Sequence, residues 1–205
     1  MKQNNAVVIG ITGPAGSGKS YICKLIAEVA ETLIIDTDSI AKEQMKKGGI
    51  SYKGVVKEFG KEILLDDGEI NRAKLASIVF DDGEKLKTLN SLTHPNVIEE
   101  SKRIIKENRA KYNVILLESA LLVDAGCDKM CDYVWYVHTS VKERSERLKV
   151  TRGYSDEKIK SVQKSQRKST FYREHADAVI NNSEALGEER LKKALIRRLK
   201  VVANL

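Results

Sequence analysis

The sequence predicts an α/β fold: a three-layer arrangement in which a five-stranded parallel sheet lies between helices. Two observations carry this prediction. Short apolar runs typical of buried strands alternate along the chain with amphipathic runs typical of helices. A glycine-rich segment also joins the first strand directly to the first helix. The expected strands are Val7 to Thr12, Leu33 to Ile35, Val114 to Leu117, Tyr133 to Val137 and Ala178 to Ile180.

The glycine-rich segment, Gly13 to Ser20, matches the P-loop pattern G-x-x-x-x-G-K-S. Its glycines let the backbone curl so that N–H groups point at phosphate oxygens, and the next helix turns its positive end to the same place. Lys19 suits the β- and γ-phosphates, and the Ser20 hydroxyl suits a magnesium ion. The sequence therefore predicts a site for ATP and Mg²⁺. The expected nucleotide-binding residues are Gly13, Ala15, Gly16, Ser17, Gly18, Lys19, Ser20 and Tyr21.

Composition narrows the class of protein. With 205 residues, 41% hydrophobic and 32% charged, the chain suits one core domain with an inserted subdomain. No apolar stretch approaches the roughly 20 residues of a membrane span, and the first strand begins too early for a cleavable signal, so we expect a cytoplasmic protein. The net charge of +7 mixes 36 basic with 29 acidic residues. Since a site for phosphorylated substrates also needs basic groups, we expect no nucleic-acid partner.

The second expected strand ends in Asp36-Thr37-Asp38. Ligands of open parallel sheets lie beyond the carboxyl ends of strands, so both carboxylates are expected beside the phosphates. Asp38 is the candidate to orient an acceptor hydroxyl and take its proton, and Asp36 is a candidate for the magnesium shell. The alternative is that they cap the following helix, a role that is compatible with catalysis for Asp36 and less so for Asp38.

Residues 39–112 contain no strand pattern. The segment is far longer than the connection that two neighbouring parallel strands need. We expect a helical insertion that holds the second substrate; the alternative is a purely structural cap. Breaks are expected at Gly48-Gly49, at Asp66 to Gly68 and at His94-Pro95. The amphipathic runs are Ile40 to Lys47, Ser51 to Phe59, Ala73 to Phe80, Glu84 to Leu92 and Val97 to Asn108.

Residues 141–173 are expected to form a helical lid. Ser140 and Glu143 have the spacing of a capping box, and Gly153 suits the end of the helix that starts there. A second helix is expected from Ser155. A hairpin of this kind excludes water from a transferable phosphoryl group, and Arg152 at its tip would neutralise transition-state charge. The alternative is a solvated basic surface. The nucleotide-binding core then comprises residues 1–38, 113–140 and 174–205.

Beyond the P-loop, nearly the whole chain resembles the dephospho-coenzyme A kinase family. Several short segments carry the resemblance in the family's order. They are Ile11-Thr12-Gly13, Gly16 to Ser20, Ile35 to Asp38, Phe59-Gly60, Asp67 to Arg72, Leu89-Asn90, His94-Pro95, Leu121-Leu122, Arg152, Gln166 and Ala176 to Asn182.

The resemblance implies transfer of a phosphoryl group from ATP, with Mg²⁺, to the ribose 3′-hydroxyl of dephospho-coenzyme A, the last step of coenzyme A synthesis. It implies ATP and dephospho-coenzyme A as partners, and we expect a monomer or weak homo-oligomer. The implied roles are Asp38 as catalytic carboxylate, Lys19 on phosphate, Ser20 on magnesium, Arg152 as lid arginine, and Asn71, Arg72 and His94 in the acceptor pocket.

The chain also departs from the family pattern. It has Gly13-Pro14-Ala15 where Gly-Gly-Ile is usual, Tyr21 where Thr is usual, and Ala120 to Asp124 in place of Pro-Leu-Leu-Phe-Glu, which leaves the role of Asp124 open. Glu118 is a less favoured magnesium candidate than Asp36. Two alternative functions stay open: a P-loop kinase for a nucleoside, nucleotide or sugar acid, and a nucleotide switch or nucleic-acid-associated ATPase. The guanine motif Asn-Lys-x-Asp of GTPase switches is absent from the sequence.

Overall fold

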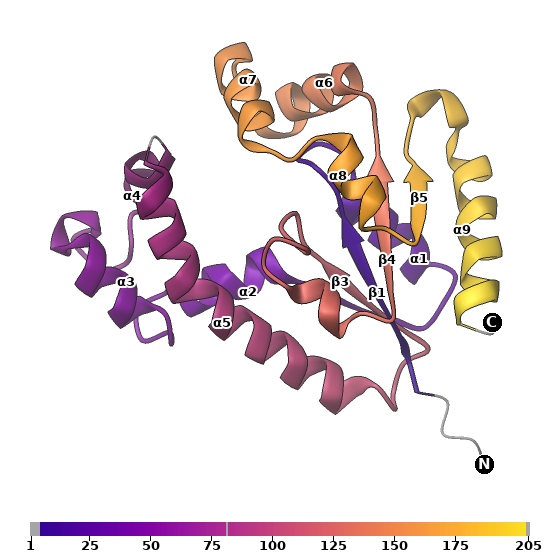
Figure 1. The fold of residues 1–205 in the computed structure, drawn as a ribbon, viewed down its shortest axis with the longest axis horizontal. Helices are drawn as coiled ribbons and strands as arrows, with labels where there is room; N and C mark the ends of the chain where they lie inside the picture. The colour runs from indigo at the N-terminus through magenta and orange to yellow at the C-terminus, as the bar shows by residue number, and fades with distance from the viewer. Residues whose placement is uncertain (1–4, 81, 204–205) are drawn as a thin grey trace. The chain divides into compact units, whose positions relative to one another are not determined.

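The structure is a computed structural model that describes residues 5–80 and 82–203 (Figure 1). It divides into two compact units. Of the described residues, the first comprises 5–35 and 105–203, and the second comprises 36–80 and 82–104.

The first unit is built on a five-stranded sheet with the order β2-β3-β1-β4-β5. The central strand β1 (Val7–Thr12) runs parallel to β3 (Val114–Glu118) on one side and to β4 (Tyr133–His138) on the other. The edge strands are β2 (Thr32–Asp36) and β5 (Ala178–Asn181), of which β5 pairs in parallel with β4. All five predicted strands are confirmed. Both faces of β1 are covered, which explains its unbroken apolar sequence.

Helices α1 (Lys19–Ala27) and α9 (Glu188–Val202) share one hydrophobic core with the sheet. Their apolar side chains recur at helical spacing, including Ile22 and Ile26 on α1 and Leu191 and Leu195 on α9. The remaining elements of this unit are η2 (Cys127–Met130), α6 (Val141–Arg152), α7 (Asp156–Ser165), α8 (Ser169–Glu174) and η3 (Glu184–Leu186). The predicted fold class is therefore confirmed.

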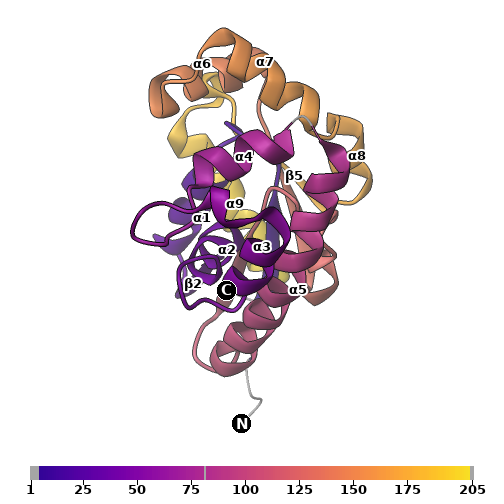
Figure 2. The ribbon, with the colours of Figure 1, turned by 90° about the vertical axis from the view of Figure 1, so that its left-hand side faces the viewer.

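The second unit is helical, as predicted for this part of the chain (Figure 2). It contains α2 (Thr37–Gln44), α3 (Tyr52–Phe59), η1 (Lys61–Ile63), α4 (Arg72–Phe80) and most of α5 (Gly83–Asn108). It has a core of its own, formed by Val55, Phe59, Ile63, Ile70, Leu75 and Val79.

The prediction that His94-Pro95 interrupts a helix is wrong, because α5 continues from Gly83 to Asn108 with Pro95 inside it. A proline removes one backbone donor and normally bends or ends a helix. The carbonyl that loses its N–H donor is that of Ser91, and side chains on either side of Pro95 add hydrogen bonds to other carbonyls of the preceding turn. The Thr93 hydroxyl donates to the Leu89 carbonyl at 2.9 Å, and the Asn96 amide donates to the Leu92 carbonyl at 3.2 Å.

The two helices of the predicted lid form an antiparallel pair. Helix α6 ends at Gly153, whose φ of 61° is in the left-handed region, and the Ser155 side chain caps α7. The Gln163 amide donates to the Ser145 hydroxyl at 2.9 Å, and Lys149 lies 2.6 Å from the Asp156 carboxylate. These contacts join the helices near both ends of the pair.

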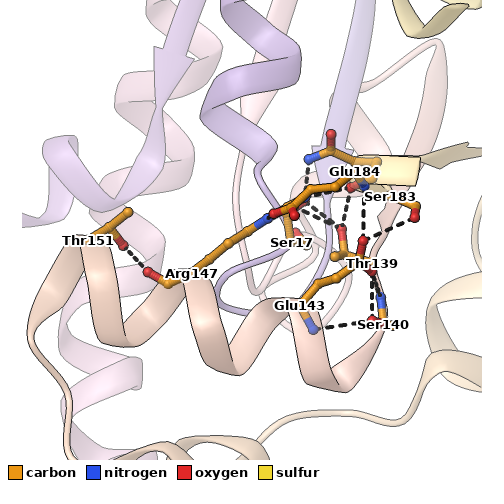
Figure 3. Close-up of polar contacts among 9 residues, drawn as sticks. Ser17, Thr139, Ser140, Glu143, Arg147, Thr151, Ser183 and Glu184 are labelled. Carbon is orange, nitrogen blue, oxygen red and sulfur yellow. Dashed lines mark hydrogen bonds and ion pairs between the residues drawn. The ribbon is translucent and has the colours of Figure 1, made fainter. Parts of the chain in front are cut away.

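The Glu143 carboxylate joins the start of α6 to the loop after β5 (Figure 3). The predicted capping box is confirmed, since Glu143 and Ser140 each bond the other's backbone N–H. Glu143 also accepts hydrogen bonds from the Ser183 hydroxyl at 3.0 Å and from the Glu184 N–H at 2.9 Å. The hydrogen bond from Ser140, followed by that from the Glu184 backbone, lowers the pKa of Glu143 to about 2.

The substitution Glu143→Gln tests this junction through its pH dependence. Because the pKa in the folded state lies below the ordinary value of 4.5, the carboxylate stabilises the fold above that value and loses this effect as the pH falls towards about 2. We expect the variant to melt below the wild type at neutral pH and the gap to shrink with acidification. Glu146→Gln, an exposed position on the same helix, is the control. A gap that is constant across this range would contradict the assignment.

Candidate active site

The P-loop backbone depends on three glycines. Gly13, Gly16 and Gly18 have φ angles of 147°, 78° and 88°, which L residues with a side chain rarely adopt. A Cβ atom at Gly13 would lie 2.7 Å from the Val137 carbonyl oxygen, and one at Gly18 would meet the Asn182 amide nitrogen. The loop therefore requires glycine both for its conformation and for the space around it.

The carbonyl oxygen of Ser17 holds the outer side of this loop in place (Figure 3). It accepts hydrogen bonds from the Thr139 hydroxyl at 3.0 Å, the Asn182 amide at 2.8 Å and the Arg147 guanidinium at 3.5 Å. Arg147 also donates to the Asn182 carbonyl at 2.9 Å. The residues that follow β4 and β5 thus fix the loop against the sheet.

Helix α1 begins at Lys19 directly after the loop. Gly18 is its N-cap, no side chain caps it, and its first turn contains no acidic residue. The amide groups at the start of a helix lack partners within that helix and carry a partial positive charge. This end of α1 is consequently suited to an anion such as phosphate.

Lys19 and Ser20 lie at this helix end. The Lys19 ammonium donates to the Gly13 carbonyl at 3.0 Å, across the mouth of the loop. The Ser20 hydroxyl donates to the buried Glu118 carboxylate, at the end of β3, at 2.6 Å. A hydroxyl and a carboxylate side by side are oxygen ligands of the kind that Mg²⁺ prefers, so these residues fit that ion.

Asp36 has the capping role that the sequence left open. Its side chain accepts the Asp38 N–H at 3.0 Å and the Ser39 hydroxyl at 2.6 Å, and so caps α2. Sequence reasoning favoured Asp36 over Glu118 for magnesium, but it is Glu118 that contacts Ser20 in the first unit. Asp38 lies in the first turn of α2 with an exposed side chain.

The expected acceptor residues all lie in the second unit. The Asn71 side chain accepts the Lys74 N–H at 3.0 Å at the start of α4, and Arg72 donates to the Lys42 carbonyl at 2.9 Å. Arg72 therefore ties α4 to α2, the helix that carries Asp38. His94 is half-buried on α5.

Tyr21 and Arg152, both in the first unit, show different surroundings. The Tyr21 hydroxyl donates to the Glu188 carboxylate at 2.7 Å, and Lys192 bridges Glu188 and Glu28, so the Tyr21 side chain links α1 to α9. Arg152 is exposed at the end of α6, with its guanidinium carbon 5.9 Å from the centroid of the Tyr154 ring.

Sequence reasoning gave no role to Thr139 or to Asn182, although Asn182 ends one of the segments that carry the family resemblance. Each directly follows a strand, at the carboxyl edge of the sheet, so the topological rule that singled out Asp36 and Asp38 also points to them. The signal was present in the sequence, but neither residue carries a charge that draws attention to it.

Comparisons with known proteins agree with this geometry. The family model for dephospho-CoA kinase matches residues 7–188. A dephospho-CoA kinase of Carboxydothermus hydrogenoformans is 37% identical over 184 residues, which cover 89% of each chain.

Solved structures also share the fold. The crystal structure of TT1252 from Thermus thermophilus is 27% identical with a TM-score of 0.78, and the match covers 97% of this chain and 98% of that one. A shikimate kinase of Acinetobacter baumannii, 16% identical, has a TM-score of 0.51 over 96% of this chain and 93% of its own, and shows the fold alone. Since the family model spans most of the sequence and a relative above 30% identity covers most of it, the chain belongs to the dephospho-CoA kinase family.

Proposed function

We propose that this chain transfers the γ-phosphoryl group of ATP to the ribose 3′-hydroxyl of dephospho-CoA. The observation that carries the proposal is the braced glycine loop before the uncapped start of α1, in a chain of this family. In the reaction, the bond between the γ-phosphorus and the ADP oxygen breaks, a bond to the 3′-oxygen forms, and the hydroxyl proton leaves. ADP and CoA are the products. Positioning and charge stabilisation account for catalysis of this kind.

The donor phosphates would bind the N–H groups of the loop and of the first turn of α1. Lys19, which contacts the Gly13 carbonyl, would extend its charge to the β- and γ-phosphates. Ser20 and Glu118 would hold magnesium, and Asp36 is a further candidate for its shell. When bound, that ion would neutralise charge on the phosphate oxygens.

Asp38 is proposed to accept the proton of the 3′-hydroxyl. Because the Asp36 side chain caps α2, the Asp38 carboxylate is not needed for that role, which supports the proposal. Asn71, Arg72 and His94 are proposed for the acceptor pocket, and Arg72 holds α4 on α2 there. Arg152 is proposed to neutralise charge on the phosphates when the α6–α7 pair closes as a lid.

We expect the chain to act in the cytoplasm as a monomer or weak homo-oligomer, with ATP and dephospho-CoA as partners and without nucleic acid. Within residues 5–80 and 82–203, no helix is both long and apolar enough to span a membrane.

Acceptor choice tests the proposed function directly. We expect ATP consumption with dephospho-CoA, and formation of CoA detected by chromatography, but no comparable rate with a nucleoside, a nucleotide or shikimate. Turnover of one of these acceptors without turnover of dephospho-CoA would favour the alternative kinase function.

Asp38→Asn tests the proposed base. Loss of a general base lowers turnover by about 10²-fold or more, while the affinity for ATP should stay close to that of the wild type. Glu43→Gln, an exposed acid on the same helix, is the matched control and should retain activity. Initial rates and ATP titrations measure both effects, and near-normal turnover of Asp38→Asn would refute the assignment.

Glu118→Gln tests the proposed magnesium ligands. The amide can still accept the Ser20 hydrogen bond but lacks the charge that attracts a cation. We expect the Mg²⁺ concentration for half-maximal rate to rise by about 10-fold or more, as for other losses around a metal site. Rates measured against Mg²⁺ at saturating substrates give this value; an unchanged value would exclude Glu118 from the metal shell.

A further inference from the structure

Arg144 on α6 is a buried arginine without a counter-charge. Only 8% of the residue is exposed, and its Nε atom is buried with no hydrogen-bond partner. Among the described residues, no carboxylate forms an ion pair with its guanidinium. Burial of a charge in this state is costly, and unsatisfied buried polar groups are rare in native proteins. The position of Arg144 therefore calls for an explanation.

The groups around Arg144 do not neutralise it. Tyr136 on β4 and Tyr172 on α8 stack at 5.1 Å between ring centroids, and both influence the Arg144 charge electrostatically. The Tyr136 hydroxyl contacts His138 Nδ1 at 3.0 Å. Burial, and next the charges of Arg173 and Arg144, lower the pKa of His138, so this ring is neutral at neutral pH. Two phenols and a neutral imidazole thus lie within electrostatic reach of the guanidinium.

The nearby acids are engaged elsewhere. Glu143 accepts hydrogen bonds from Ser140, Ser183 and Glu184. Asp124 accepts two hydrogen bonds from Arg167, at 2.9 and 2.7 Å. Burial is also the main cause that lowers the pKa of Arg144, which shows that its charge is poorly solvated.

Arg144 adjoins the P-loop. A Cβ atom built at Gly16 would lie 2.8 Å from the Arg144 carbonyl oxygen and 3.2 Å from its Cα atom. The backbone of α6 at this residue therefore packs directly against the bend of the loop, and the unpartnered side chain starts from the wall of the nucleotide site.

We propose that Arg144 binds a phosphate group of the substrates and is a further charged residue of the active site. The inference deepens the proposed function and rests on it. A guanidinium presents N–H groups in a planar fork that matches phosphate oxygens, and the bound anion supplies the missing counter-charge. That phosphate belongs either to ATP or to the diphosphate of dephospho-CoA.

The test compares Arg144→Met with Lys142→Met, an exposed lysine on the same helix whose substitution removes the same charge. Loss of an uncompensated buried charge should leave the melting temperature of Arg144→Met equal to or above that of the wild type. Loss of a phosphate contact should lower its kcat/KM by about 10²-fold. Lys142→Met should match the wild type in both measurements. Arg144→Gln, a polar neutral replacement, should repeat the loss of activity.

Separate titrations of ATP and dephospho-CoA identify the phosphate. A Kd that rises by about 10-fold or more for one ligand alone assigns the contact to that ligand. Unchanged affinities with a lower kcat assign it to the phosphoryl group in transfer. The affinity for ATP can be measured whichever acceptor the enzyme uses. A wrong assignment of the acceptor can therefore be told apart from a wrong assignment of Arg144. The proposal is overturned if Arg144→Met and Arg144→Gln retain the kcat/KM of the wild type. It is also overturned if these two variants melt well below the wild type while their folded fraction keeps full activity.

Discussion

The hydrogen bonds at the Ser17 carbonyl are the constraint on which the rest of the nucleotide site depends. A loop with three left-handed glycines has little intrinsic preference for one shape, because glycine loses more conformational freedom on folding than any other residue. Thr139 and Asn182 supply that preference from the ends of β4 and β5. Since these strands belong to the sheet, the shape of the loop is set by the hydrophobic core beneath it.

The same junction orients the helix pair that follows β4. Arg147 connects α6 to the Ser17 and Asn182 carbonyls, and Glu143 connects the first turn of α6 to the loop after β5. The first two turns of α6 are therefore bound to the nucleotide-binding core, whereas Gly153 and the exposed Arg152 lie at its far end. An anchored base with an exposed tip is the arrangement that a lid requires.

Local sequence signals predicted the strands, the P-loop turn and the capping box of α6, because each depends on neighbouring residues. The break expected at Pro95 is absent: α5 runs through Pro95 to Asn108, and the side chains of Thr93 and Asn96 add hydrogen bonds to carbonyls of the turn before it. The contact of Ser20 with Glu118 joins residues 98 positions apart. No local spacing rule brings these two residues together, and sequence reasoning ranked Glu118 below Asp36.

An uncapped start of α1 and an unpaired Arg144 are both unfavourable in the protein alone. The free energy of unfolding of a domain of this size is only about 5–15 kcal/mol, so two such features beside one loop lower it by a considerable fraction. Both become favourable with the same kind of ligand, since phosphate accepts hydrogen bonds from helix amides and from a guanidinium. A ligand that binds only the folded state also stabilises it by mass action. The unpaired groups of the site and its proposed affinity for phosphorylated substrates would thus have one physical origin.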